Sequence, residues 1–260
     1  MTNNAKHTKR VFMPGCSLSA YNPYAVGKML EFLQEKLQGT GAILKCCGKP
    51  TKLLGQVDKF RERYGALQEE IDRVGGEEII TACLSCYLTM SQYSPNHKVK
   101  SLWELLPEIG LPEKAKGIGK SSDIVFAIHD ACPTRNNPEI HNGIRWILKE
   151  LGYKTEEPLH TRENTRCCGF GGMVVPANPE ITSRVISRRV SEFESDYVVT
   201  YCAACREAMA KGGKKAVHIL DLIFGETVTS EFKFPQISSS PITSWVNRYK
   251  SKTIIDKVLK

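Results

Sequence analysis

The ten cysteines of this 260-residue chain are the residues whose type and spacing point most directly to chemistry. They form two sets with the spacings C-x29-CC-x35-C-x2-C and C-x34-CC-x33-C-x2-C. Clustered thiolates are ligands for zinc and for iron–sulfur clusters, because soft sulfur donors favour these metals. The sequence therefore predicts two metal centres, with Cys16, Cys46, Cys47, Cys83 and Cys86 as the ligands of one and Cys132, Cys167, Cys168, Cys202 and Cys205 as the ligands of the other.

Three other interpretations of the cysteines compete with this one. Disulfides are disfavoured because each set holds an odd number and adjacent cysteines rarely bridge each other. Buried free thiols are common for single cysteines, but not for two matched sets. Structural zinc takes four tetrahedral ligands, so it would leave one cysteine of each set unused. An iron–sulfur cluster in each half is favoured, and zinc in one half is the minor alternative.

Glycines follow both cysteine pairs. Gly48 comes directly after Cys46-Cys47, and Gly169, Gly171 and Gly172 follow the second pair. A residue without a side chain lets the backbone approach an inorganic core and donate N–H groups to its sulfides. We therefore expect these four glycines to contribute to cofactor binding.

A histidine lies just before the second set of cysteines and has no counterpart just before the first set. His129 stands three residues before Cys132, whereas the chain before Cys16 reads Met-Pro-Gly. A histidine at this place can donate a proton to a departing thiolate or a hydrogen bond to a cluster sulfur, which makes it a catalytic candidate. The alternative is a strand-end histidine whose ring bonds only to the backbone.

The elements that position these cysteines recur in both halves of the chain. Each first cysteine follows a short apolar run, each half then has an Asn-Pro helix start, a second amphipathic helix after Cys-Cys-Gly, and a strand leading into Cys-x-x-Cys. Recurrence of this whole order indicates a duplication. The predicted strands are Val11–Met13, Ile79–Ala82, Ile124–Ile128 and Tyr197–Thr200, and the predicted helices begin at Pro23 and Pro138 and span Val57–Val74 and Ile181–Phe193.

Alternation of strands and helices predicts an α/β fold. We expect two pseudo-symmetric Rossmann-like halves with mainly parallel sheets, each carrying a five-cysteine iron–sulfur site where loops converge beyond the strand ends. The expected domains are a first half at residues 9–112, a second half at residues 123–226 and a partly helical tail at residues 227–260.

The composition is that of a globular protein, with 41% hydrophobic and 25% charged residues. The N-terminus lacks the apolar run of a signal peptide and no stretch has the length of a membrane span, so we expect a cytoplasmic protein. The formal net charge of +8 counts every thiol as neutral, and thiolate-bound clusters would offset most of it. Without a basic stripe or a recognition motif, nucleic-acid binding is not expected.

From about Val11 to Phe224, the two copies of the cysteine motif resemble the cysteine-rich "CCG" domain in the B subunit of heterodisulfide reductase. The resemblance implies two non-cubane [4Fe–4S] clusters, each held by one set of five cysteines, with a disulfide substrate between them. It also implies two partners, a ferredoxin-like iron–sulfur subunit of the C type and a flavin subunit of the A type. Because the chain has no C-x2-C-x2-C-x3-C-P run, it resembles the stand-alone B subunit.

The expected function is therefore that of a catalytic subunit that performs two-electron disulfide or related sulfur chemistry within a complex. The alternative is an electron-relay subunit of a dehydrogenase or quinone-linked complex without disulfide chemistry. A third interpretation is a structural scaffold with zinc in one half.

Overall fold

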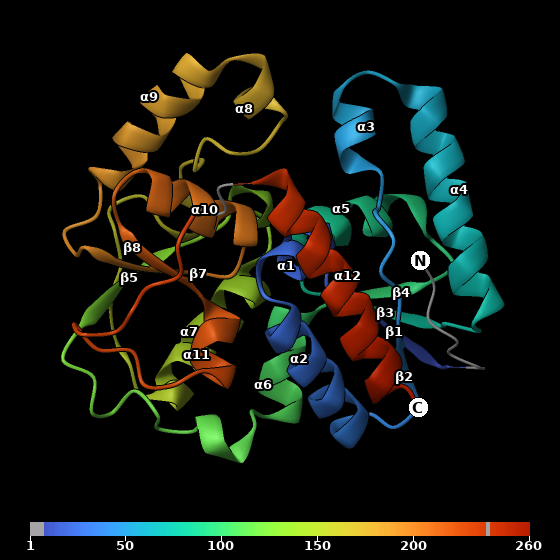
Figure 1. Ribbon diagram of the computed structural model, residues 1–260, viewed down its shortest axis with the longest axis horizontal. Coiled ribbons are helices and arrows are strands. Elements are labelled where there is room, and N and C mark those ends of the chain that lie inside the picture. The colour runs from blue at the N-terminus through green and yellow to red at the C-terminus, as the bar shows by residue number, and fades with distance from the viewer. Residues whose placement is uncertain (1–7, 238–239) are drawn as a thin grey trace. The chain divides into compact units, whose positions relative to one another are not determined.

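The computed structural model describes residues 8–237 and 240–260, and it confirms the predicted α/β fold with parallel sheets (Figure 1). The chain divides into two compact units: unit 1 contains Met1–Leu102 and Ser238–Lys260, and unit 2 contains Trp103–Ile237. Residues 1–7, which carry part of the argument against a signal peptide, lie outside the described residues.

Each unit is built on one four-stranded, all-parallel sheet of the same topology. The strand order is β2-β1-β3-β4 in unit 1 and β6-β5-β7-β8 in unit 2. The four predicted strands are the two central strands of each sheet. The bounds are β1 Arg10–Met13, β2 Thr40–Ala42, β3 Glu78–Thr81 and β4 Lys98–Ser101, then β5 Val125–His129, β6 Lys154–Glu156, β7 Tyr197–Thr200 and β8 Lys215–His218.

This topology places the cysteines. In each sheet the chain moves outward from the first strand to one edge and then returns to the other side, so the order reverses between the two central strands. Loops at the carboxyl ends of strands separate at such a switch point and leave room for a ligand. Cys16 and Cys83 follow the central strands of unit 1, and Cys132 and Cys202 follow those of unit 2.

The start of helix α2 in unit 1 follows a local sequence signal. The Asn22 side chain accepts a hydrogen bond of 2.9 Å from the Ala25 amide, and Pro23 occupies the first turn of α2, as predicted. The buried positions of α2 and α4 face the sheet, with Leu33 and Leu67 fully inaccessible. The helices are α1 Cys16–Tyr21, α2 Pro23–Lys36, α3 Lys49–Leu53, α4 Val57–Arg73, α5 Leu84–Tyr93 and α12 Pro241–Val258.

Unit 2 repeats this pattern with local differences. Its α7 ends at Leu151 and is followed by Gly152, whose left-handed conformation is a common helix stop. No helix in residues 8–237 or 240–260 is long and apolar enough to cross a membrane. The helices are α6 Leu102–Ile109, α7 Pro138–Leu151, α8 Val174–Ala177, α9 Pro179–Val190, α10 Ala203–Lys211 and α11 Ile219–Phe224, with 3-10 turns at Glu113–Ala115, Cys132–Thr134 and Arg162–Asn164.

Helix α12 returns to unit 1 and lies along α1 and α2 (Figure 1). Its side chains donate hydrogen bonds to carbonyls of α1: Arg248 Nε to Cys16 at 3.2 Å and Ser251 Oγ to Ser19 at 3.0 Å. These bonds satisfy α1 carbonyls and hold the turn that carries the first cysteine.

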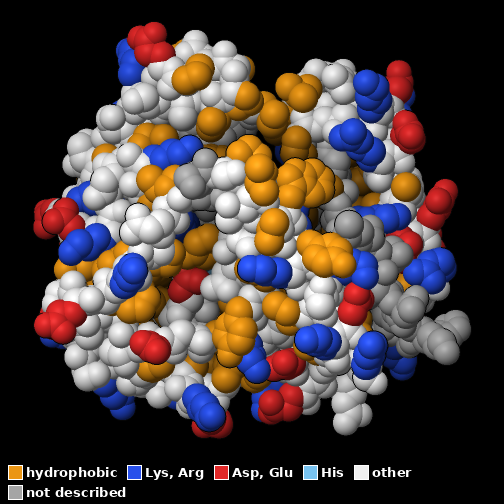
Figure 2. Space-filling model, in the orientation of Figure 1, with side chains coloured by type: hydrophobic (Ala, Val, Ile, Leu, Met, Phe, Trp, Pro, Cys, Tyr) orange, Lys and Arg blue, Asp and Glu red, His pale blue; other side chains and the backbone are white. Residues whose placement is uncertain are grey.

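The opposite face of α12 is exposed and apolar at its N-terminal end. Ile242, Trp245, Val246 and Tyr249 follow helical spacing, and Trp245 is 66% exposed. Figure 2 shows hydrophobic side chains gathered over this helix, with lysine and arginine side chains beside them. Helix α12 thus has one face packed on α1 and α2 and one exposed apolar face.

Gly143 provides a test of helix packing in unit 2. A Cβ atom at this position of α7 would lie 1.9 Å from the carbonyl oxygen of buried Trp103 in α6. Because a backbone atom cannot move aside as a side chain does, Gly143→Ala is expected to lower the free energy of unfolding by about 3 kcal/mol. Gly65→Ala in α4 is the matched control, because a Cβ there meets no atom within 4 Å, and it should stabilise the protein by about 0.5–1 kcal/mol. Urea unfolding of both variants checks this, and equal effects would contradict the packing account.

Candidate metal centres

The five cysteines of unit 1 come together as one continuous row of thiols. Side-chain contacts run from Cys16 to Cys46, then to Cys47, Cys86 and Cys83. They come from three places: the turn after β1, the loop after β2 and the Cys-x-x-Cys at the start of α5. Cys47 and Cys86 are buried, whereas Cys46 is exposed. The fold therefore joins residues that are 70 positions apart in the sequence.

Unit 2 brings its five predicted ligands together in the same order. The row runs from Cys132 to Cys167, Cys168, Cys205 and Cys202. Cys168 and Cys205 are buried, like their counterparts in unit 1. Ten of ten predicted cysteines thus lie in two rows of identical connectivity, although their binding of metal stays a prediction.

Close packing of the thiols shifts their protonation. The pKa of Cys47 is lowered to about 4 because first Cys46 and then Cys86 hydrogen-bond to its sulfur. The pKa of Cys167 is lowered to about 2 by the same contacts from Cys132 and Cys168. The pKa of Cys132 is raised in turn, first by its hydrogen bond to Cys167 and then by burial. In each row, one ionised thiol makes its neighbours harder to ionise. A bound cation would remove this penalty, so the thiols form a set of donors suited to a metal.

Glycines bring the backbone close to these sulfurs. The Gly48 amide donates to Cys46 Sγ at 3.4 Å and the Gly169 amide donates to Cys167 Sγ at 3.3 Å. Both glycines are buried and left-handed, with φ of 76° and 85°, a conformation that other residues rarely adopt. Gly171 and Gly172, also predicted to bind the cofactor, lie in an exposed turn before α8.

A further glycine closes the unit 1 site. A Cβ atom at Gly15 would lie 2.4 Å from Cβ of Cys83, so only glycine lets the turn before Cys16 approach the loop after β3. Sequence reasoning missed this residue, although its position directly before the first cysteine was a usable signal.

His129 lies beside the two buried thiols of the unit 2 row. One of its ring nitrogens and the Sγ atoms of Cys168 and Cys205 all lie within 4.8 Å of one another. The ring is fully buried, and its Nδ1 accepts a 3.1 Å hydrogen bond from Arg189 Nε. The alternative of a histidine bonded only to the backbone is therefore wrong for Nδ1. Burial, followed by the charge of Arg189, lowers the pKa of His129 to about 3.

Buried polar atoms without partners show how well the residues fit a bound cluster. Among the described residues, five side-chain atoms are buried and lack a hydrogen-bond partner. Such groups are rare because each costs free energy unless something satisfies it. Four of them belong to His129, to its partner Arg189 and to the threonines two residues before Cys83 and Cys202, so a sulfide-containing core would offer partners near these groups. These atoms are Thr81 Oγ1, His129 Nε2, Arg189 Nη2 and Thr200 Oγ1, and the fifth is Thr182 Oγ1.

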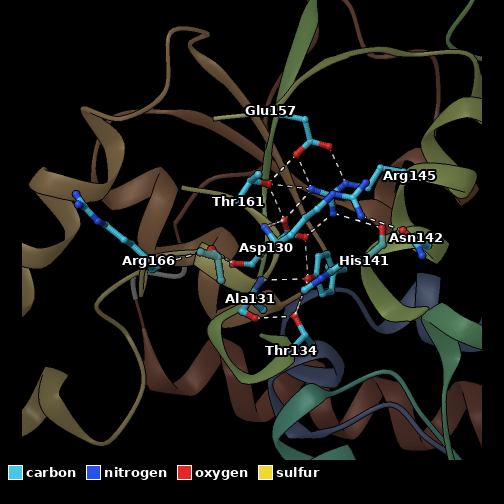
Figure 3. A network of polar contacts seen from close by, with 12 residues as sticks. Asp130, Ala131, Thr134, His141, Asn142, Arg145, Glu157, Thr161 and Arg166 are labelled. Atoms are coloured by element: carbon cyan, nitrogen blue, oxygen red, sulfur yellow. Dashed lines mark hydrogen bonds and ion pairs between the residues drawn. The ribbon is translucent and has the colours of Figure 1, made fainter. Parts of the chain in front are cut away.

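Asp130, the residue after His129, is the centre of a buried network in unit 2 (Figure 3). Arg145 binds its carboxylate in bidentate fashion, with N–O distances of 2.6 and 2.7 Å. The hydroxyls of Thr161 and Tyr201 donate to the same carboxylate at 2.9 and 3.0 Å. Arg145 also contacts Glu157 at 2.6 Å.

This network joins all three cysteine-bearing loops of unit 2. The Arg162 amide donates to the Asp130 carboxylate at 2.8 Å, and Thr165 Oγ1 donates to the Asp130 carbonyl at 2.7 Å. Arg162 and Thr165 precede Cys167, Asp130 precedes Cys132, and Tyr201 precedes Cys202. The carboxylate therefore fixes the loops that carry the thiols. Sequence reasoning missed this role, and only the position of Asp130 at a strand end pointed to it.

The family model for the cysteine-rich domain, CCG, matches the chain twice, at residues 11–91 and 126–210. Each match covers the elements that carry one row of thiols. The chain belongs to the CCG cysteine-rich domain family. The predicted resemblance is confirmed.

Several curated proteins are similar to this CCG protein. An uncharacterized iron–sulfur protein of Methanococcus maripaludis is 25% identical, over 68% of this chain and 37% of its own length. The D subunit of the dihydromethanophenazine:CoB–CoM heterodisulfide reductase of Methanosarcina mazei is 26% identical, over 78% of this chain and 53% of its own length. The B subunit of the fumarate reductase (CoM/CoB) of Methanothermobacter marburgensis is 25% identical, over 68% and 38%. The chain thus spans about half or less of the length of these relatives.

A glutamate racemase of Bacillus anthracis is among the similar solved structures, with a TM-score of 0.35 and 11% identity over 84% of this chain and 78% of the racemase. A likeness of this size carries no conclusion about function.

The Asp130 network predicts a stability difference between two carboxylates. Asp130→Asn removes the charge that a largely buried Arg145 faces, so we expect the free energy of unfolding to fall by about 3 kcal/mol. The matched control is Glu157→Gln, which removes the partly exposed second carboxylate on the same arginine (side chain 42% exposed), and it should cost less than about 1 kcal/mol. Chemical denaturation of both variants measures the difference. Equal losses would show that the buried carboxylate is not the centre of the network.

Proposed function

We propose that each unit holds one iron–sulfur cluster on its row of five cysteines, and that the chain is the redox subunit of a larger enzyme. The observation that carries the proposal is the identical order of thiol contacts in the two units. All-cysteine ligation is typical of iron–sulfur clusters. The curated relatives support this, because they are named as iron–sulfur proteins and reductase subunits.

We further propose [4Fe–4S] clusters of a non-cubane type. A tetrahedral zinc site needs four ligands and would leave a thiol of each row unused. A cubane likewise presents four irons to four thiolates. Five sulfurs in a continuous row, with the middle ones buried, instead support a core whose irons are spread along the row and which employs the fifth thiolate as a bridge. Zinc in one half is the competing proposal.

The reaction we propose is the two-electron cleavage of a disulfide. One disulfide accepts two electrons and two protons, the S–S bond breaks, and two thiols form. Bound clusters would supply the electrons, one from each unit. The chain's own residues hold the thiolates: buried Cys47 and Cys168 anchor each row, amides of Gly48 and Gly169 donate to neighbouring sulfurs, and Asp130 fixes the loops of unit 2. The two protons are taken from solvent.

A one-electron donor is required, since the reaction consumes two electrons per turnover. We propose a ferredoxin-like subunit in this role, and a flavin subunit that feeds it. The similarity to relatives that are named as subunits supports partner subunits in general.

The proposed function is tested by disulfide turnover. Anaerobically purified protein is reduced with titanium(III) citrate, freed of excess reductant and mixed with 2-hydroxyethyl disulfide. We expect reoxidation of the iron–sulfur absorbance and two thiols for each two electrons lost by the protein. Protein stripped of metal by a chelator is the control. It should release no thiol beyond the amount that its own cysteines release by thiol–disulfide exchange.

The alternative function predicts a different result in the same assay. If the reduced protein passes electrons to a one-electron dye but forms no thiol from the disulfide, it is an electron relay without disulfide chemistry.

A further inference from the structure

The two units differ at one position that borders the two buried thiols of each cysteine row. Met13 is the last residue of β1 and pairs with Thr81, and His129 is the last residue of β5 and pairs with Thr200. The registers make the two residues structural equivalents. Met13 lies in an apolar cluster with Cys47 and Cys86, whereas His129 lies beside their counterparts Cys168 and Cys205. An apolar thioether in unit 1 is thus replaced by an imidazole in unit 2.

The hydrogen bond from Arg189 determines which nitrogen of His129 carries the proton. Arginine has N–H donors and no acceptor, so the Nδ1 that receives its bond must present a lone pair. The ring is then neutral with its proton on Nε2. Arg189 is itself held in place: its Nη1 donates to Glu192 at 2.5 Å and to the His160 carbonyl at 3.0 Å, and its guanidinium stacks on Phe193 at 4.5 Å.

The Nε2–H donor of His129 is buried and has no protein partner. Since the ring lies within 4.8 Å of two sulfurs of the unit 2 row, sulfur is the acceptor that its surroundings offer. A nitrogen that carries a proton cannot also bind a metal, so this tautomer excludes His129 as a neutral ligand. Arg189 Nη2 is likewise a buried donor without a hydrogen-bond partner.

We propose that His129 donates Nε2–H to a sulfur beside Cys168 and Cys205 in the unit 2 centre, with Arg189 fixing the tautomer, and that this makes the unit 2 centre easier to reduce than the unit 1 centre. The inference rests on the proposed function, because it needs a cluster in each unit. Its physical basis is that a donor to a cluster sulfur stabilises the more negative, reduced state, and that Met13 offers no donor. His129 is thus a positioning and tuning residue.

The test compares variants at the two equivalent positions. His129→Met gives unit 2 the residue of unit 1, and Met13→Leu is the matched control in unit 1. Iron content is measured first, and both centres are then followed by EPR during a redox titration. Signals are assigned with Cys47→Ser and Cys168→Ser, each of which removes a buried cysteine from one row.

We expect His129→Met to retain full iron and to lower the reduced-to-oxidised ratio of the unit 2 centre about tenfold at fixed potential, which is about 59 mV for one electron. The unit 1 centre should not change, and Met13→Leu should leave both midpoints in place. An unchanged unit 2 midpoint overturns the inference. Loss of iron from unit 2 in well-folded His129→Met also overturns it, because it would identify His129 as a ligand.

A second measurement needs no variant and so survives a folding failure. Wild-type protein labelled with 15N-histidine is reduced and its electron spin echo modulation is recorded. A weak nitrogen coupling on the unit 2 signal is expected for an N–H···S contact. A strong coupling, typical of direct ligation, or no coupling at all overturns the inference. Absence of iron from the wild-type protein would instead contradict the proposed function. Iron analysis separates this outcome from a strong coupling and from a missing coupling.

Discussion

Five sulfurs in contact cannot all be ionised without a positive charge among them, and this constraint shapes both halves of the protein. In unit 2 the pKa of Cys167 falls because its neighbours hydrogen-bond to it, and the pKa of Cys132 rises for the same reason. The fold brings the thiols together nonetheless, with the middle of each row buried. The energetic conflict is relieved if the rows bind a metal core, and the glycine amides and unpaired buried donors at their edges support such a core.

The duplicated chain meets this constraint in two ways. In unit 1 the first cysteine turn is held from outside, by Arg248 and Ser251 of α12, and the row borders an apolar cluster that includes Met13. In unit 2 the loops are held from inside, by the carboxylate of Asp130 and the donors around it. A buried polar network is rigid when every member is satisfied, so a buried carboxylate fixes the loops of unit 2, whereas hydrogen bonds from α12 hold the first cysteine turn of unit 1.

The sequence predicted the parts of the fold that depend on local patterns. The central strands β1, β3, β5 and β7 follow apolar runs directly, and the Cys-x-x-Cys motifs follow β3 and β7. The edge strands β2, β4, β6 and β8 were not predicted, because none of them contains a run of three apolar residues and several are polar, as in Lys154–Glu156. Their pairing is decided by the neighbouring strand and not by their own composition.

The candidate site was predicted from the sequence as a set of ligands, but not as an arrangement. Spacing alone identified ten cysteines, whereas the order of contacts depends on loops that meet in space. Arg145 and Arg189 were missed for another reason: an arginine on an amphipathic helix is normally solvent-exposed, yet Arg189 is fully buried. Such residues are found only when the buried group they bond to, here Asp130 or His129, is located.

Metal and sulfide analysis shows whether both rows of cysteines hold iron–sulfur clusters. With a [4Fe–4S] cluster in each unit, we expect about eight iron and eight acid-labile sulfide per chain, with no zinc, in anaerobically purified protein. Cys168→Ser should lose the unit 2 cluster and keep the unit 1 cluster, which leaves about half of the iron. Zinc in either unit of the wild-type protein, or full iron content with an unchanged EPR spectrum in Cys168→Ser, would contradict this expectation.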